Sequence, residues 1–310
     1  MEARIFSVTN QENPMQRQTA ADFDQELLIL FDAYVHGSID RRGFLDRAQK
    51  FAVGGLTASM LLASLSPNFA AAQVVPKDDM RIKTQRLDYA SPNGSGTMKG
   101  YLALPANASG KLPGILVVHE NRGLNPHIED IARRLALDNF VAFAPDALTP
   151  LGGYPGNEDK AREEFAKLDQ TKTREDFVTA VQVLKARPEC TGKVGAVGFC
   201  YGGGVVHMLS TRLPDLAAGV PFYGNHPVFA DAVKVKAPLM IHFAGVDERI
   251  NAAWPAYEAA LTAAGANYVA HQYPGTQHGF NNDTTPRFDA AAAKLAWERT
   301  LGFFQRHLRG

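Results

Sequence analysis

The sequence predicts an α/β fold with a mostly parallel central sheet that helices cover on both faces. Two patterns predict it. From residue 81 onward, short apolar segments alternate with longer segments whose apolar residues recur at helical spacing. Segments such as 114–118 are apolar at almost every position, which is typical of strands buried on both faces of a sheet. The chain has 310 residues, 45% of them hydrophobic, which is enough for one large domain with an extension or for two small domains.

The expected elements follow one another in a regular order. Residues 82–90 and 98–104 flank a turn-rich segment at 91–96 and predict an opening antiparallel hairpin. Further strands are expected at residues 114–119, 140–145, 193–199, 216–223, 238–244 and 267–273. Helices are expected between them at about 127–138, 158–187 with a break, 202–212, 252–264 and 286–308.

The first 75 residues differ in character from the rest and are predicted to form an N-terminal extension before one domain at 76–310. Residues 22–36 have the periodicity of a short amphipathic helix. The apolar face of such a helix needs a surface to pack on. That surface is either the body of the same chain or a second subunit, in which case the N-terminal helices would favour an oligomer.

A second pattern in the extension resembles an export signal. Arg41 and Arg42 precede a weakly hydrophobic segment at 51–65, and three small residues follow at 70–72. This order is similar to a twin-arginine signal. The resemblance implies a periplasmic protein whose mature form begins near Gln73.

Two departures favour the alternative, a cytoplasmic protein that keeps the extension as a helical arm. About forty residues precede the arginines, and Asp40 and Asp46 stand where such signals carry an uncharged and a basic residue. Segment 51–65 is also too short to anchor the mature protein in a bilayer.

The composition limits the class of partner. Lysine plus arginine and aspartate plus glutamate number 32 each, so no net charge attracts nucleic acid or an anionic membrane surface. A small, neutral molecule is the expected partner. The two cysteines lie at opposite ends of an expected strand, too far apart for a disulfide. We expect no cofactor and no metal, because the sequence has neither a dinucleotide-binding motif nor metal-ligand spacing.

The strongest local signal is a G-x-C-x-G motif centred on Cys200. It follows the expected strand 193–199 and precedes a helix. A nucleophile on such a sharp strand-to-helix turn needs small residues two positions to either side, here Gly198 and Gly202. A helix N-terminus also stabilises a thiolate. The alternative is a buried structural cysteine beside a glycine-rich turn.

The order of two later residues favours a nucleophile. Asp247 follows the strand expected at 238–244, and His278 follows the strand expected at 267–273. Nucleophile, acid and histidine in this chain order, each after a strand, are typical of the α/β-hydrolase fold. Both residues would lie at the edge where α/β sheets bind ligands. Asp247 would orient His278, which would exchange a proton with Cys200.

These motifs resemble the dienelactone hydrolase family over roughly residues 85–308. The resemblance implies an ester or lactone hydrolase and adds Glu120, whose counterpart in the family contacts the nucleophile and helps to deprotonate it. The alternative for Glu120 is a carboxylate that only caps its loop. Family and physics also imply an oxyanion hole made by the main-chain amides of Tyr201 and Asn121.

The resemblance weakens where the family holds the carboxylate of its lactone. The family has two arginines there, whereas this chain has the segment around Tyr154 and, four residues after the histidine, Asn282. We therefore expect Arg122, Tyr154 and Asn282 to contact substrate, with Arg249 or Arg287 as other sources of positive charge, and uncharged esters or lactones to be preferred. The alternative functions are a general carboxylesterase without lactone preference and a non-catalytic or redox-sensing thiol protein.

Overall fold

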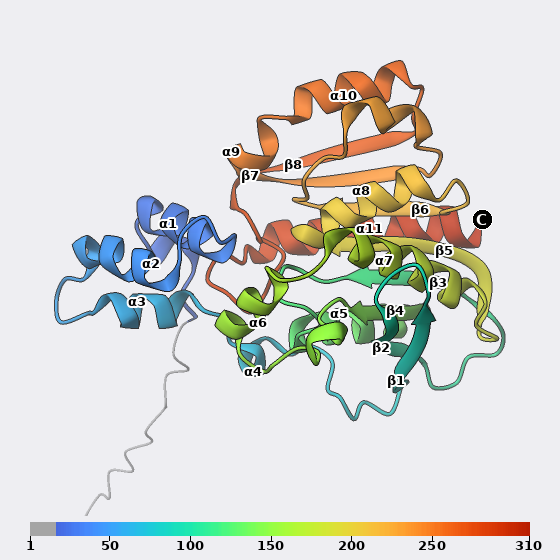
Figure 1. The fold of residues 1–310 in the computed structure, drawn as a ribbon, viewed down its shortest axis with the longest axis horizontal. Helices are drawn as coiled ribbons and strands as arrows, with labels where there is room; N and C mark the ends of the chain where they lie inside the picture. The colour runs from blue at the N-terminus through green and yellow to red at the C-terminus, as the bar shows by residue number, and fades with distance from the viewer. Residues whose placement is uncertain (1–16) are drawn as a thin grey trace, which may run out of the picture.

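The computed structural model describes residues 17–310, and most of it is one eight-stranded sheet with helices on both faces (Figure 1). The strand order is β1-β2-β4-β3-β5-β6-β7-β8. β1 pairs antiparallel with β2 and β2 antiparallel with β4, and the other neighbours are parallel. The predicted α/β fold with its opening hairpin is confirmed. The strands are β1 (Ile82–Ser91), β2 (Gly96–Pro105), β3 (Leu112–Val118), β4 (Val141–Asp146), β5 (Cys190–Phe199), β6 (Ala218–Phe222), β7 (Leu239–Val246) and β8 (Tyr268–Gln277).

The helices of the body form a layer on each face of the sheet. One core lies under α5 and α11, and a second lies under α6, α7 and α8. α10 and the adjoining α9 complete the cover beside β7 and β8. These helices are α5 (Pro126–Leu137), α6 (Glu158–Phe165), α7 (Gln170–Lys185), α8 (Tyr201–Arg212), α9 (Glu248–Asn251), α10 (Trp254–Ala263) and α11 (Ala290–Arg309).

The continuous apolar strands are explained by this double cover. In β3, Ile115 and Val117 face the core under α5 and α11, whereas Leu116 and Val118 face the core under α7 and α8. Successive side chains of a strand point to opposite faces, so both sets must be apolar.

The N-terminal extension is folded rather than extended, and residues 17–72 are called the N-terminal arm below. Its helices are α1 (Gln25–Val35), α2 (Arg41–Ala48), α3 (Ala58–Leu65) and the short α4 (Phe69–Ala72). The apolar faces of α1, α2 and α3 meet in a core of their own, which includes Leu28, Phe31 and Phe44. The surface that α1 was expected to need is therefore found within the chain itself.

The export motif has a structural place in the arm. Arg41 begins α2, Asp40 caps that helix by accepting from the amide of Gly43, and Arg41 pairs with Asp159 of α6 at 2.8 Å. No helix in the part of the chain that the structure describes is both long and apolar enough to cross a membrane. The first 16 residues of the extension lie outside the described part.

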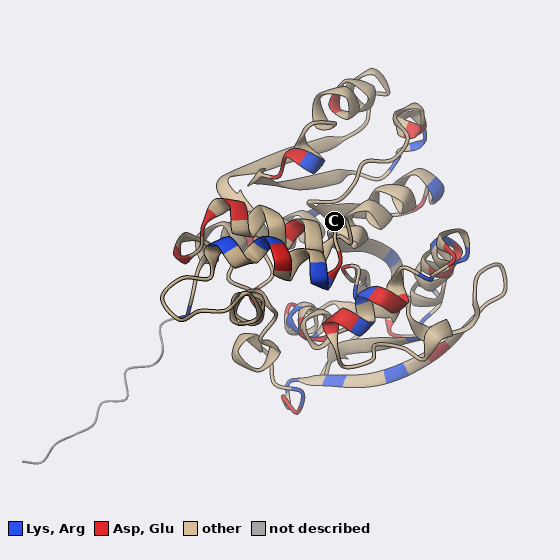
Figure 2. Cartoon of the chain, turned by 60° about the vertical axis from the view of Figure 1, so that its left-hand side comes forward, with Lys and Arg blue, Asp and Glu red and all other residues tan. Residues whose placement is uncertain are grey.

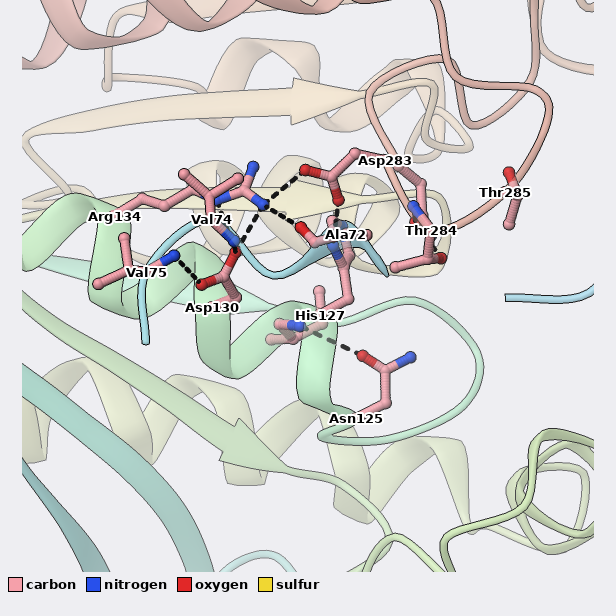
Figure 3. A network of polar contacts seen from close by, with 12 residues as sticks. Ala72, Val74, Val75, Asn125, His127, Asp130, Arg134, Asp283, Thr284 and Thr285 are labelled. Atoms are coloured by element: carbon pink, nitrogen blue, oxygen red, sulfur yellow. Dashed lines mark hydrogen bonds and ion pairs between the residues drawn. The ribbon is translucent and has the colours of Figure 1, made fainter. Parts of the chain in front are cut away.

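Polar contacts fasten the last residue of the arm, Ala72, and the two residues Val74 and Val75 that follow it to the body (Figure 3). The carboxylate of Asp130 in α5 accepts from the amides of Val74 and Val75 at 3.1 and 2.9 Å. Arg134 then joins Asp130 to Asp283 through contacts of 2.6 Å. Because these side chains are buried or nearly so, breaking the network would leave charges without partners, and the arm is held firmly at this end.

Candidate active site

Cys200 lies on a strained turn between β5 and α8. Its φ of 54° and ψ of −112° lie in a region that residues other than glycine rarely adopt. A Cβ on Gly198 would lie 2.1 Å from the main-chain oxygen of Gly202, and one on Gly202 would lie 2.3 Å from that of Val118. Both glycines of the motif are therefore needed for the backbone to pass through this turn.

The predicted acid and histidine meet at the carboxyl edge of the sheet. Asp247 follows β7 and His278 follows β8, and Nδ1 of His278 lies 2.6 Å from Oδ2 of Asp247. Both side chains are buried. Nε2 of His278 has no hydrogen-bond partner among the described residues. The free nitrogen of an oriented imidazole is thus available near Cys200, with its nearest donor atom within 4.8 Å of the sulfur.

A second histidine, which was not predicted from the sequence, contacts the same sulfur from the N-terminal arm. His36 is the C-cap residue of α1, and its Nε2 lies 3.2 Å from Sγ of Cys200. Its ring packs edge-on against that of His278, with 4.6 Å between centroids. Nδ1 of His36 is held by the main-chain oxygen of Asp32 at 2.8 Å and by its carboxylate at 3.2 Å.

Charges at the site favour a thiolate. Burial of Cys200 opposes ionisation, but His36 and His278 outweigh it and lower the pKa of the thiol to about 6. Burial opposes the imidazolium as well, yet the sulfur and Asp247 raise the pKa of His278 to about 10. The pKa of His36 is raised despite burial, because Cys200 and Asp32 stabilise its charged form. A thiolate paired with an imidazolium is therefore the favoured state at neutral pH.

The other predicted residues surround this centre in different ways. The Glu120 carboxylate accepts from the side-chain amide of Asn282 at 2.9 Å. The side chains of Asn121 and Arg122 donate to the main-chain oxygen of Val35, at 2.9 and 3.2 Å, and so hold the end of α1. Tyr201 begins α8, where main-chain amides lack partners within the helix.

The arm closes the space over the sulfur. The cavity that contains Cys200 and His278 has a volume of about 40 Å³, which is enough for a few water molecules. The arm contributes Phe31, Tyr34, Val35, Ser66 and Pro67 to its wall. The body contributes Glu120, Asn121, Arg122, Glu158, Asp159, Asn282, Thr285 and Arg287.

Tyr154 is the predicted contact residue that the structure places outside this wall. Its amide donates to Asp146, and its hydroxyl donates to Glu158 at 2.8 Å. Tyr154 lines a different pocket, together with Asp146 and residues of β2 and α5. Its position in the sequence could not indicate this.

His36, Cys200 and His278 also offer two nitrogens and one sulfur within 4.8 Å of one another, donor types that Zn²⁺ accepts. The sequence did not suggest this group, because His36 is distant from the other two. However, the Arg249 guanidinium lies 3.1 Å from Nε2 of His36 and 3.4 Å from Nδ1 of His278. A fixed positive charge so close disfavours a divalent cation, and a shared proton fits the site better.

The sheet order, the turn at Cys200 and the placement of Asp247 and His278 define an α/β-hydrolase. The chain belongs to the dienelactone hydrolase family, whose profile matches residues 98–308. A second profile, YqhI-like, matches residues 15–53 and so covers much of the N-terminal arm.

Relatives and solved structures agree with this assignment. A "Putative carboxymethylenebutenolidase" of Synechocystis is 31% identical over 241 residues, which cover 70% of this chain and 95% of that protein. The "Putative hydrolase fragment YghX" of Escherichia coli K12 is 52% identical over 116 residues, 37% of this chain and 99% of the fragment. The crystal structure of a "Putative Dienelactone Hydrolase" of Klebsiella pneumoniae has a TM-score of 0.65 at 26% identity and covers 72% of this chain and 99% of its own.

Proposed function

We propose that this hydrolase cleaves ester or lactone bonds of small molecules through an acyl-enzyme on Cys200. The observation that carries the proposal is the buried Asp247–His278 pair beside a cysteine on a strained strand-to-helix turn. A strained nucleophile, an oriented base and a lowered thiol pKa are the parts that acyl transfer requires.

The proposed reaction has two halves. In the first, the Cys200 thiolate forms a bond to the carbonyl carbon as the ester C–O bond breaks, and the leaving oxygen takes the proton of the His278 imidazolium. In the second, His278 takes a proton from water, the hydroxide attacks the thioester, and the S–C bond breaks. The proton then remains with the sulfur–imidazole pair, and the enzyme is restored.

Two main-chain amides would stabilise the negative oxygen between these halves. The amide of Tyr201 stands at the start of α8, and that of Asn121 lies in the loop after β3. In this proposal both point at the carbonyl oxygen, where one such donor typically contributes about 3–4 kcal/mol. Glu120, which accepts from Asn282, shapes this side of the pocket.

The charges of the pocket favour an uncharged substrate. Arg122 already binds the oxygen of Val35 and lies 3.7 Å from Glu158, and Arg287 lies 3.3 Å from Asp32. Both guanidiniums are already paired with a carboxylate, although Nε of Arg287 has no hydrogen-bond partner among the described residues, so a substrate carboxylate would compete with these partners. We therefore expect kcat/KM for a neutral aryl ester to exceed that for a lactone carrying a carboxylate.

The acyl-enzyme can be tested directly. The full chain is incubated with p-nitrophenyl acetate at mildly acidic pH and digested, and the acetyl group is located by mass spectrometry. We expect it on Cys200, with turnover lost in Cys200→Ala and reduced to a trace in Cys200→Ser.

The second cysteine is the matched control. Cys190 is buried at the far end of β5, and Cys190→Ala should keep both labelling and turnover. Near-normal turnover in Cys200→Ala would refute the proposal. A parent enzyme that is oxidised at Cys200 but never acylated would instead support the redox-thiol alternative.

A further inference from the structure

We propose that the N-terminal arm contributes a catalytic residue: His36, oriented by Asp32, forms a second Asp–His pair on Cys200 and takes the thiol proton in the resting enzyme. This inference deepens the proposed function and rests on it. The observation behind it is the 3.2 Å contact between Nε2 of His36 and Sγ of Cys200.

The hydrogen bonds of His36 define which nitrogen can act as the base. A main-chain oxygen only accepts, so Nδ1, at 2.8 Å from the oxygen of Asp32, carries a proton. In the neutral ring, Nε2 is then the nitrogen with the lone pair, and it faces both Sγ of Cys200 at 3.2 Å and an N–H of Arg249 at 3.1 Å. The ring therefore has the tautomer and the direction needed to accept a proton from the thiol.

Contacts from the body hold His36 in this position. Asn121 and Arg122 bind the oxygen of Val35, which precedes it, and Arg162 binds the oxygen of Tyr34 at 2.9 Å. Arg287 reaches the carboxylate of Asp32 at 3.3 Å. These four side chains, from three parts of the body, contact the last turns of α1. Covering an apolar surface would not require such directed polar contacts.

His36 is the histidine with a hydrogen-bond-length contact to the sulfur, whereas a ring nitrogen of His278 lies within 4.8 Å of it. The Glu120 carboxylate, which the family resemblance suggested as the activating base, accepts from the side chain of Asn282 and makes no hydrogen bond to Cys200 among the described residues. The S–H bond of Cys200 breaks, its proton goes to Nε2 of His36, and the electron pair stays on the sulfur. A resting enzyme with this proton transfer holds its thiolate before any substrate arrives.

Charges from all sides act on His36. Asp32 and the sulfur favour its protonated form, whereas Arg249 at 3.1 Å and the His278 ring oppose it. This opposition disfavours two protonated rings side by side, and the rings of His36 and His278 lie 4.6 Å apart between centroids. In this proposal the proton that His36 takes therefore passes to His278, which gives it to the leaving oxygen as the S–C bond forms.

The experiment measures the thiolate directly, so that it does not depend on hydrolysis. In full-length protein carrying Cys190→Ala, the rate of alkylation by iodoacetamide is followed from pH 4 to pH 10 in the parent, in His36→Gln and in the control His307→Gln, which changes a partly exposed histidine of α11. We expect the half-point of the rate to rise by about one pH unit or more in His36→Gln and to stay unchanged in the control. We also expect kcat/KM for a neutral ester to fall by about 10²-fold.

Folding and rescue are controlled separately. If His36→Gln does not show a cooperative thermal transition, Asp32→Asn serves instead, with a smaller rise in the half-point. Free imidazole should restore part of the activity of His36→Ala, which a purely structural role would not allow.

The outcomes separate this inference from the proposed function. An unchanged half-point in a folded His36→Gln overturns the role of His36, even if Cys200→Ala is inactive. Turnover in Cys200→Ala refutes the proposed function, whatever the alkylation profile shows. Activity that is lost with EDTA and restored by Zn²⁺ in the parent alone would overturn the inference in favour of a metal site.

Discussion

Two Asp–His pairs flank one sulfur in this protein, and they are built in different ways. Asp247 and His278 lie 31 residues apart on loops after neighbouring strands, and a single 2.6 Å contact joins them. Asp32 and His36 lie one helical turn apart, and the imidazole there is held mainly by a main-chain oxygen at 2.8 Å. Sheet topology places the first pair, whereas the docking of a separate helical unit places the second.

The difference shows which contacts keep each pair beside the sulfur. The pair of Asp247 and His278, the sheet-borne pair, is held by the same sheet as Cys200, because β5, β7 and β8 all belong to it. The helix-borne pair is well formed locally, since residues four apart face each other on a helix. Its distance from the sulfur, however, depends on contacts between the arm and the body. Figure 2, which brings the left-hand side of Figure 1 forward, marks basic and acidic residues along the helices there.

The largest expected difference between the pairs concerns their carboxylates. Asp247→Asn should lower kcat/KM by about 10⁴-fold, because the amide favours the wrong tautomer of His278. Asp32→Asn should cost far less, since the main-chain oxygen still holds Nδ1 of His36. Steady-state kinetics with one neutral ester measures both variants. Equal losses would contradict the distinction between the pairs.

The pH dependence of kcat/KM should report the ionisation of Cys200 and His278. The pKa of Cys200 is lowered to about 6, so the thiolate is present above that pH and is lost below it. The pKa of His278 is raised to about 10, so the imidazolium that protonates the leaving oxygen is present below that pH. We expect a broad plateau between these limits and about a tenfold loss per pH unit outside them. An acid limb near pH 9, as in an ordinary thiol, would show that neither histidine acts on the sulfur.

The last prediction concerns the native N-terminus, which decides whether the mature protein keeps both pairs. Twin-arginine export with cleavage after Ala72 remains our proposal for location, and a mature protein beginning near Gln73 would lack the helix-borne pair. In the structure, the small residues at 70–72 form α4 and Ala72 is buried, so cleavage requires this segment to unfold.

Mass spectrometry of the protein from its native cells decides between the two forms. A periplasmic form that begins near Gln73 would confirm export and would leave Cys200 with the sheet-borne pair alone. An intact N-terminus in the cytoplasmic fraction, unaffected by changing Arg41 and Arg42 to lysine, would refute export and leave both pairs in place.

Most of the fold could be predicted from the sequence, because its signals are local. Apolar runs, glycines and caps lie within a few residues of the feature that they predict. The expected helix at 127–138 begins at Pro126 because Asn125 caps it, a shift of one residue. Cys200, Asp247 and His278 could be chosen for a similar reason, since each directly follows a strand.

The position of His36 could not be predicted in this way. Its contact with Cys200 spans 164 residues and depends on where the arm docks, which no local pattern records. One signal was present: Asp32 and His36 are spaced to meet on the polar side of an amphipathic helix. Segment 51–65 instead predicted an export signal, because a weakly apolar run after two arginines has a similar composition in a signal and in a packed helix.

The narrow cavity over Cys200 has a consequence beyond turnover. A thiolate is the form of cysteine that peroxides oxidise, first to a sulfenic acid and then irreversibly. Cys200 is 8% exposed, and the cavity above it holds about 40 Å³ behind Phe31 and Tyr34 of the arm. On the proposed mechanism, an oxidant and an ester would meet the same obstacle, and the strength with which the arm docks would affect both substrate entry and the lifetime of the thiolate.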